Sequence, residues 1–179
     1  MSFKKDLGRK AAAEIANDFL RKTKGLYKRS ELAGSLRRKE PLVHDIDFAV
    51  IPRGDDFGVW SEKVKRRVTS IGGRVISFGK VICNFRYRDA QVNLFVCLNE
   101  DAWGVTLMWA TGPKGHTIGM TIKARNKGLI INSTGIWTRE EPQRLVGART
   151  EEEVGVILGW KYKPPEARGK SSKQNSLFY

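Results

Sequence analysis

The chain has 179 residues, with 33 Lys and Arg against 19 Asp and Glu, which gives a formal net charge of +14. Its 40% of hydrophobic residues suffices for a buried core and excludes a wholly disordered chain. The sequence contains no long apolar run, secretory-signal pattern or lipidation motif, and basic residues are spread along it. We therefore expect a nucleic-acid partner rather than a membrane, although a merely basic soluble protein is the alternative.

The helices predicted from apolar periodicity cover, in chain order, residues 5–22, 57–71, 101–109, 114–127 and 150–159. The predicted strands, which are β-branched or aromatic runs, cover residues 27–33, 45–51, 74–78, 80–88, 90–98, 129–132 and 135–137. Asp101 and Thr150 are the expected N-caps of the third and fifth helices. The tail after Pro164 is rich in polar residues and is expected to be mobile.

Two cysteines, Cys83 and Cys97, lie inside apolar strand-like runs. We interpret them as reduced core residues, with a disulfide or a metal pair as the less favoured alternative. This use of cysteine fits a protein of the cytoplasm, of a nucleoid or of the inside of a virion, and not a secreted one.

The segment Gly34-Ser35-Leu36-Arg37-Arg38 is followed by Asp45-Ile46-Asp47 at the start of an apolar strand. Period-2 alternation places the two carboxylates on one face of a sheet. Carboxylates this close repel each other unless a divalent cation lies between them, and Mg²⁺ is commonly shared between carboxylates and a substrate phosphate. The small Gly-Ser turn can approach that phosphate, and Arg37 or Arg38 can neutralise it. The pattern indicates nucleotidyl transfer.

Four ordered blocks resemble the catalytic core of family X DNA polymerases over about residues 25–168. They are residues 34–47, Val92-Asn93-Leu94-Phe95, residues 109–137 with Trp109-Ala110-Thr111-Gly112-Pro113, and residues 150–168 with Tyr162-x-Pro164-Pro165-Glu166-x-Arg168. Only 33 residues precede Gly34, so the chain is similar to the minimal, often virus-encoded members.

The resemblance implies an α+β fold: a nucleotidyltransferase palm with a twisted mixed sheet and flanking helices, plus a smaller C-terminal α/β subdomain. The expected division is a palm over residues 1–111, a nascent-base-pair-binding subdomain over residues 112–168 and a mobile tail over residues 169–179. The implied partners are dNTP and primer–template or gapped DNA, bound by a monomer. The implied cofactor is Mg²⁺, as two ions, for which Mn²⁺ can substitute.

The resemblance also implies a role for each matching residue. Metal binding and catalysis fall to Asp45, Asp47 and, at the position of the third carboxylate, Asn93. Triphosphate binding falls to Gly34, Ser35 and Arg38. Contacts with the incoming nucleotide and the new base pair fall to Trp109, Ala110, Gly112, Thr117 and Thr121.

Several of these positions depart from the family pattern, including Ala110, where the family often has an aromatic residue. Asn93 replaces an Asp, and its neutral amide cannot accept the primer hydroxyl proton, so binding would survive while transfer is impaired. Natural loss and a deliberate Asp→Asn change both fit this residue. Thr117 and Thr121 replace an Asn and an Arg that probe the new base pair, which predicts loose nucleotide choice.

The leading hypothesis is a repair or gap-filling DNA polymerase, an enzyme that adds dNTPs to a primer 3′-hydroxyl by a two-metal mechanism. The first alternative is an inactive family X core that serves as a DNA- or nucleotide-binding module. The second alternative is a minimal transferase that acts on RNA or on a protein hydroxyl.

The net charge predicts DNA binding that weakens steeply with salt. Each phosphate that the protein neutralises on a duplex should contribute about −0.9 to the slope of log K against log salt concentration. A fluorescence-anisotropy titration between low and moderate salt measures this slope. An affinity that does not change with salt would contradict the expectation.

Overall fold

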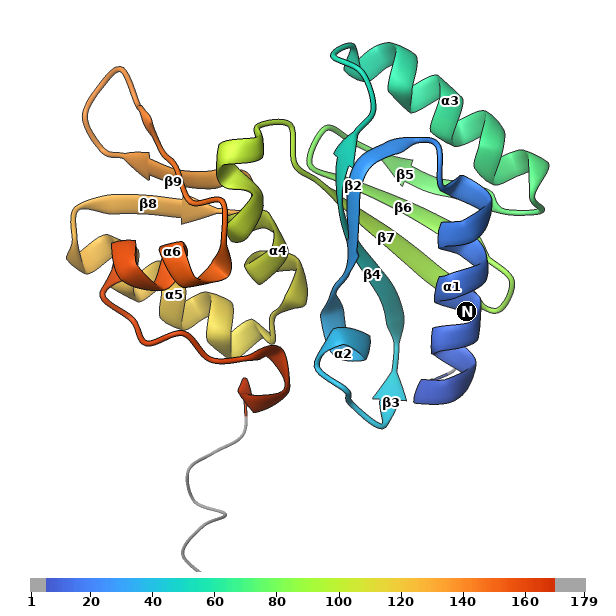
Figure 1. Ribbon diagram of the computed structural model, residues 1–179, viewed down its shortest axis with the longest axis horizontal. Coiled ribbons are helices and arrows are strands. Elements are labelled where there is room, and N and C mark those ends of the chain that lie inside the picture. The colour runs from blue at the N-terminus through green and yellow to red at the C-terminus, as the bar shows by residue number, and fades with distance from the viewer. Residues whose placement is uncertain (1–5, 170–179) are drawn as a thin grey trace, which may run out of the picture.

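The computed structural model describes residues 6–169, and Figure 1 shows two α/β units side by side. The helices are α1 (Arg9–Thr23), α2 (Gly34–Arg37), α3 (Phe57–Ser70), α4 (Trp103–Thr111), α5 (Lys114–Asn126) and α6 (Glu151–Leu158), with 3₁₀ helices η1 (Glu100–Ala102) and η2 (Pro165–Ala167). The strands are β1 (Leu7–Gly8), β2 (Tyr27–Leu32), β3 (Leu42–Val43), β4 (Asp45–Pro52), β5 (Arg74–Phe78), β6 (Ile82–Tyr87), β7 (Ala90–Val96), β8 (Leu129–Asn132), β9 (Gly135–Thr138) and β10 (Leu145–Val146).

The first unit is built on a mixed five-stranded sheet with strand order β2-β4-β7-β6-β5. Strands β4 and β7 run parallel, and the other neighbours run antiparallel. Helices α1 and α3 cover the face of the sheet that is turned away from the second unit (Figure 1). Aromatic and aliphatic side chains from both layers form the core there, including Phe19, Phe48, Trp60, Val64, Val68 and Phe85. Burial of this apolar surface provides the main driving force for folding of the unit.

Helix α4 packs against both units and is buried almost all round its circumference. Leu107 and Ala110 pack with Ala49 and Ile51 against the opposite face of the five-stranded sheet. Val105 and Met108 belong instead to the core of the second unit. A helix that is apolar on all sides fits such a position between two cores.

The second unit combines the antiparallel sheet β10-β9-β8 with α5 and α6. Its core contains Met120, Ala124, Ile136, Val154 and Leu158. Thr150 caps α6, as predicted, by accepting a hydrogen bond from the backbone N–H of Glu153 at 3.2 Å. The predicted α+β class, with a mixed sheet and a smaller C-terminal α/β part, is therefore confirmed.

Local details differ from three sequence predictions. Gly34 and Ser35 begin the four-residue helix α2 instead of a simple turn. Asn99, and not Asp101, supplies a cap, because its side chain accepts from the N–H of Asp101 at 3.0 Å and starts η1. The first helix begins at Arg9, because Leu7 and Gly8 pair with β3, and residue 5 lies outside the described part of the chain.

Both cysteines are buried and free, as predicted. Burial raises the pKa of the Cys83 thiol to about 11. Within residues 6–169, none of the helices has the length and apolar character needed to cross a lipid bilayer. Of the predicted mobile tail over residues 169–179, positions 170–179 lie outside the described residues.

His116 is a half-buried residue of α5 that packs against the segment following α6. Its ring stacks on Trp160 with centroids 4.6 Å apart, and burial, assisted by the nearby charge of Arg168, lowers its pKa to about 4. Trp160 is 44 positions later in the chain, so local spacing gave no sign of the contact.

The lowered pKa of His116 predicts a loss of stability at acid pH. Between about pH 6.5 and pH 4 the unfolded chain binds a proton at His116 that the folded protein does not, so stability falls as pH decreases through this window. We expect the drop in melting temperature from pH 7 to pH 5 to be smaller in His116→Gln than in the parent chain. An equal drop in the two proteins, followed by circular dichroism, would contradict this assignment.

Candidate active site

The two carboxylates of the predicted motif lie at the start of β4 on the face of the sheet opposite α1 and α3. Asp45 and Asp47 alternate with Ile46, which is fully buried in the core. In the parallel pairing with β7, Asp45 lies opposite Gln91 and Asp47 lies opposite Asn93. The predicted shared face is therefore present, and Asn93 lies next to the carboxylates on the neighbouring strand.

Gly34 approaches the Asp47 carboxylate so closely that a side chain would not fit. A Cβ placed on Gly34 would lie 2.0 Å from Asp47 Oδ2, and Gly34 has φ +60°. Both the space and the left-handed backbone therefore require glycine. A hydrogen bond of 2.8 Å from the N–H of Ala33 to the carbonyl oxygen of Asp47 joins the same two segments. The Gly-Ser segment therefore lies directly beside the second carboxylate of the motif.

The amide of Asn93 is held by two hydrogen bonds, and the residue is only 7% exposed. Its Nδ2 donates to Asp47 Oδ1 at 2.8 Å, and its Oδ1 accepts from Gln91 Nε2 at 2.9 Å. An amide can thus sit against Asp47 without the repulsion that a carboxylate at this position would meet. Gln91 is a site residue that sequence reasoning missed, although its i−2 position relative to Asn93 places it on the same face.

The two arginines after the Gly-Ser pair point toward the second unit. Arg38 donates through Nη1 to the carbonyl oxygen of Thr111, at the end of α4, and lies 3.6 Å from Glu40. Arg37 donates to the hydroxyl of Thr111 at 2.7 Å and, with two nitrogens, to Glu151. Arg37 is thus engaged in this contact between the units, which sequence reasoning did not anticipate.

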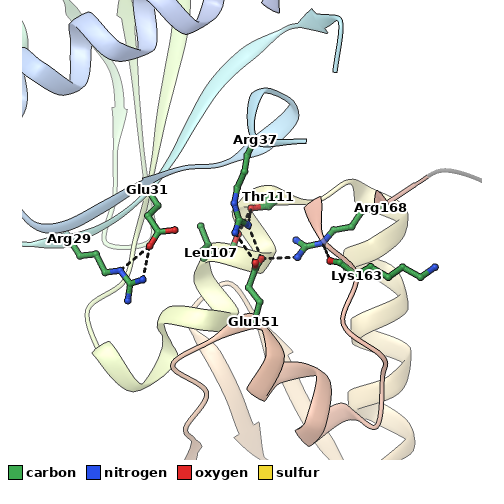
Figure 2. Close-up of polar contacts among 8 residues, drawn as sticks. All are labelled: Arg29, Glu31, Arg37, Leu107, Thr111, Glu151, Lys163 and Arg168. Carbon is green, nitrogen blue, oxygen red and sulfur yellow. Dashed lines mark hydrogen bonds and ion pairs between the residues drawn. The ribbon is translucent and has the colours of Figure 1, made fainter. Parts of the chain in front are cut away.

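Glu151, the first residue of α6, is buried between two arginines (Figure 2). Arg37 binds both of its carboxylate oxygens at 2.8 Å, and Arg168 Nη2 lies 3.0 Å from Glu151 Oε1. Arg168 is itself fully buried and donates through Nε to the carbonyl oxygen of Lys163 at 2.9 Å. This bidentate, charge-assisted cluster joins α2 of the first unit to α6 and to the segment after it.

The residues expected near the incoming nucleotide lie on α4, at its end and on α5. Gly112 follows α4 with φ +60°, and a Cβ on it would meet Arg38 Nη1 at 3.5 Å. Ala110 is buried between the units, and Trp109 packs partly against the second core. The hydroxyls of Thr117 and Thr121 donate within α5, to the carbonyl oxygens of Lys114 and Thr117 at 2.8 Å and 3.0 Å.

Two acidic residues of the candidate site could hold a divalent cation. Asp45 and Asp47 supply oxygen ligands of the kind that Mg²⁺ shares with a substrate phosphate. Within residues 6–169 the acidic, histidine and cysteine side chains form no cluster of three that could enclose a metal ion. The neighbouring Asn93 amide is neutral, and its carbonyl oxygen accepts from Gln91.

Comparison with known proteins finds similar sequences. The sequence model of the family "DNA polymerase beta thumb" matches residues 106–169. Repair DNA polymerase X of African swine fever virus (strain Badajoz 1971 Vero-adapted) is 27% identical over 155 residues, which cover 80% of this chain and 83% of the relative. Repair DNA polymerase X of the isolate Tick/South Africa/Pretoriuskop Pr4/1996 is 27% identical over 147 residues, covering 75% and 78%.

A solved structure has the same fold. The crystal structure of Leishmania infantum polymerase beta in a ternary P/T complex aligns with a TM-score of 0.76 and 16% identity, over 93% of this chain and 77% of that one. The resemblance drawn from the four sequence blocks is therefore confirmed.

The Glu151 cluster gives a stability prediction. Glu151→Gln would leave the buried charges of Arg37 and Arg168 without their carboxylate, so we expect the free energy of unfolding to fall by about 3–5 kcal/mol. The matched control is Glu152→Gln, the same change at the next position, which is exposed. Urea unfolding measures both; equal losses in the two variants would show that the cluster contributes nothing specific.

Proposed function

We infer that this chain is a DNA polymerase of the family X type, and we propose that it extends a primer 3′-hydroxyl with dNTPs in repair or gap filling. The observation that carries the proposal is the Asp45 and Asp47 pair beside Gly34, on a fold shared with polymerase beta. The viral relatives, which are named repair DNA polymerases, support the repair role.

We propose that Asp45 and Asp47 hold Mg²⁺, or Mn²⁺ in its place, together with the nucleotide phosphates. When bound, the cation neutralises phosphate charge and polarises the phosphoryl oxygens. Gly34 and Ser35 have small side chains, so their backbone can approach the triphosphate. We assign the positively charged side chain of Arg38 to the same triphosphate. For this role the Arg38 guanidinium must exchange the carbonyl oxygen of Thr111 for a phosphate oxygen.

The second unit is proposed to hold the new base pair. We place the boundary at residues 111/112, directly after α4, with Trp109, Ala110 and Gly112 beside the incoming nucleotide. Thr117 and Thr121 have short hydroxyl side chains that α5 itself already engages. Nucleotide choice is therefore expected to be loose, with the chain acting as a monomer on primer–template or gapped DNA.

Asn93 supports a second candidate function, a DNA- or nucleotide-binding module with little transfer. Its N–H₂ group occupies Asp47 Oδ1, and an amide provides no acceptor for the primer hydroxyl proton. Nucleotide binding through Asp45 and Asp47 does not need that acceptor, so binding and transfer separate at this residue.

The discriminating experiment compares the chain with Asn93→Asp in single-turnover primer extension. A restored proton acceptor is expected to raise the transfer rate by about 100-fold or more while nucleotide affinity changes little. The control Asn132→Asp makes the same charge change in the β8–β9 turn of the second unit and should leave the rate unchanged.

A second readout needs no turnover. Without divalent cation, the new carboxylate lies against Asp47 and should lower the melting temperature; Mg²⁺ should raise the melting temperature of Asn93→Asp more than that of the parent chain. If Asn93→Asp neither responds to Mg²⁺ nor extends primers faster, the binding module is the better description.

A further inference from the structure

A row of polar side chains crosses the face of the five-stranded sheet opposite α1 and α3 and ends at the carboxylates. Strand register places Arg74 of β5 opposite Arg86 of β6, Arg86 opposite Gln91 of β7, and Gln91 opposite Asp45 of β4. Because Phe85 and Tyr87 are buried in the core on the α1 and α3 side, alternation turns Arg86 to the opposite face. The row therefore lies on the same face as the carboxylates.

The two arginines of this row form a like-charge pair that the described residues do not balance. Arg74 is exposed and Arg86 is half-buried, and neither has an ion pair or a side-chain hydrogen bond within residues 6–169. Like charges directly opposite each other on neighbouring strands destabilise a sheet. A bound anion would relieve this repulsion, and an anionic strand would engage both guanidinium groups at once.

The position of the row distinguishes it from the proposed triphosphate site. Gly34 and Ser35 follow β2 and approach β4 from one side, whereas β7, β6 and β5 extend from β4 on the other. Asp45 and Asp47 therefore lie between the Gly-Ser segment and the arginine pair. The next row of the same face, Ser77, Asn84 and Asn93, is uncharged, and Asn84 Nδ2 donates to Ser77 Oγ at 2.7 Å.

We propose that Arg74 and Arg86 bind phosphates of the primer strand close to its 3′ end. The proposal deepens the proposed function and rests on it, because it takes the primer terminus to lie at Asp45 and Asp47. Neighbouring strands are about 4.8 Å apart, so the Arg86 backbone is roughly 10 Å and the Arg74 backbone roughly 14 Å from that of Asp45. A nucleic-acid strand advances about 3.4 Å per nucleotide, so the pair meets phosphates about three to four nucleotides before the terminus.

The primer is the occupant that this geometry favours. The strand that ends at the carboxylates must have its own preceding phosphates nearby, whereas the template lies on the other side of the duplex. Arginine suits the role since its planar guanidinium binds phosphate with two parallel hydrogen bonds.

The first part of the test measures binding of a duplex with a recessed 3′ end, without nucleotide or metal. The double variant Arg74→Gln/Arg86→Gln is expected to bind the duplex about tenfold more weakly. Its slope of log K against log salt concentration should be shallower by the amount that about two phosphate contacts contribute. The control double variant Lys63→Gln/Arg66→Gln removes two exposed charges from α3, on the opposite face, and should change affinity less than twofold. Equal effects of the two double variants would overturn the proposal.

The second part identifies the strand. Uncharged methylphosphonate linkages in the last four primer positions should weaken binding by the parent chain but not weaken binding by Arg74→Gln/Arg86→Gln any further. The same linkages in the template should add to the effect of the double variant. Coupling to the template, or to neither strand, would overturn the proposal. Because the experiment measures binding alone, it can confirm the primer contact even if the chain extends no primer. If the chain extends primers but the arginine pair shows no coupling to the primer linkages, this proposal is refuted and the polymerase function is not.

Discussion

One buried carboxylate sets how the two units of the molecule meet. Glu151 begins α6 in the second unit and is bound by Arg37 from α2 and by Arg168 from the segment after η2. Removing three charged groups from water is costly, and only close, multiple hydrogen bonds offset that cost. In this contact, Arg37 of α2 reaches both Thr111 at the end of α4 and Glu151 at the start of α6.

The same short helix connects this contact to the carboxylates. Gly34, at its start, lies against Asp47, and Arg37, at its end, binds Glu151. A displacement of the second unit that pulled on Arg37 would therefore act on the Gly-Ser segment next to Asp47. Arg38 adds a second connection, from the same helix to Thr111 and to the chain reversal at Gly112. The candidate site and the second unit are thus both in contact with the same short helix, α2.

Features that depend on residues close together in the sequence could be predicted, and features that depend on contacts between distant segments could not. Alternation along one strand is local, so the shared face of Asp45 and Asp47 and the buried stripe of Trp60, Val64 and Val68 were predictable. The neighbours of these groups were not, because they come from strand pairing and from helix contacts between distant segments. Asn93 was placed by family resemblance, and its hydrogen bond to Asp47 needs the parallel pairing of β4 with β7.

The sequence did not predict contacts between residues far apart in the chain. Arg37 and Glu151 are 114 positions apart, and nothing in the spacing of either residue indicates the other. The stacking of His116 on Trp160 is also a contact between distant segments, because Trp160 lies after α6. A glycine can indicate close backbone packing in the sequence. Gly34 was predicted to be part of a small turn, and the structure shows that the Asp47 carboxylate leaves no room for a side chain there.

The most direct test of the central claim is a crystal structure of this chain with primer–template DNA, Mg²⁺ and a non-hydrolysable dNTP. The account predicts the triphosphate against Gly34 and Ser35, a cation bound by Asp45 and Asp47, and the primer 3′ end beside Asn93. A nucleotide bound elsewhere, or a cation bound without either carboxylate, would contradict it.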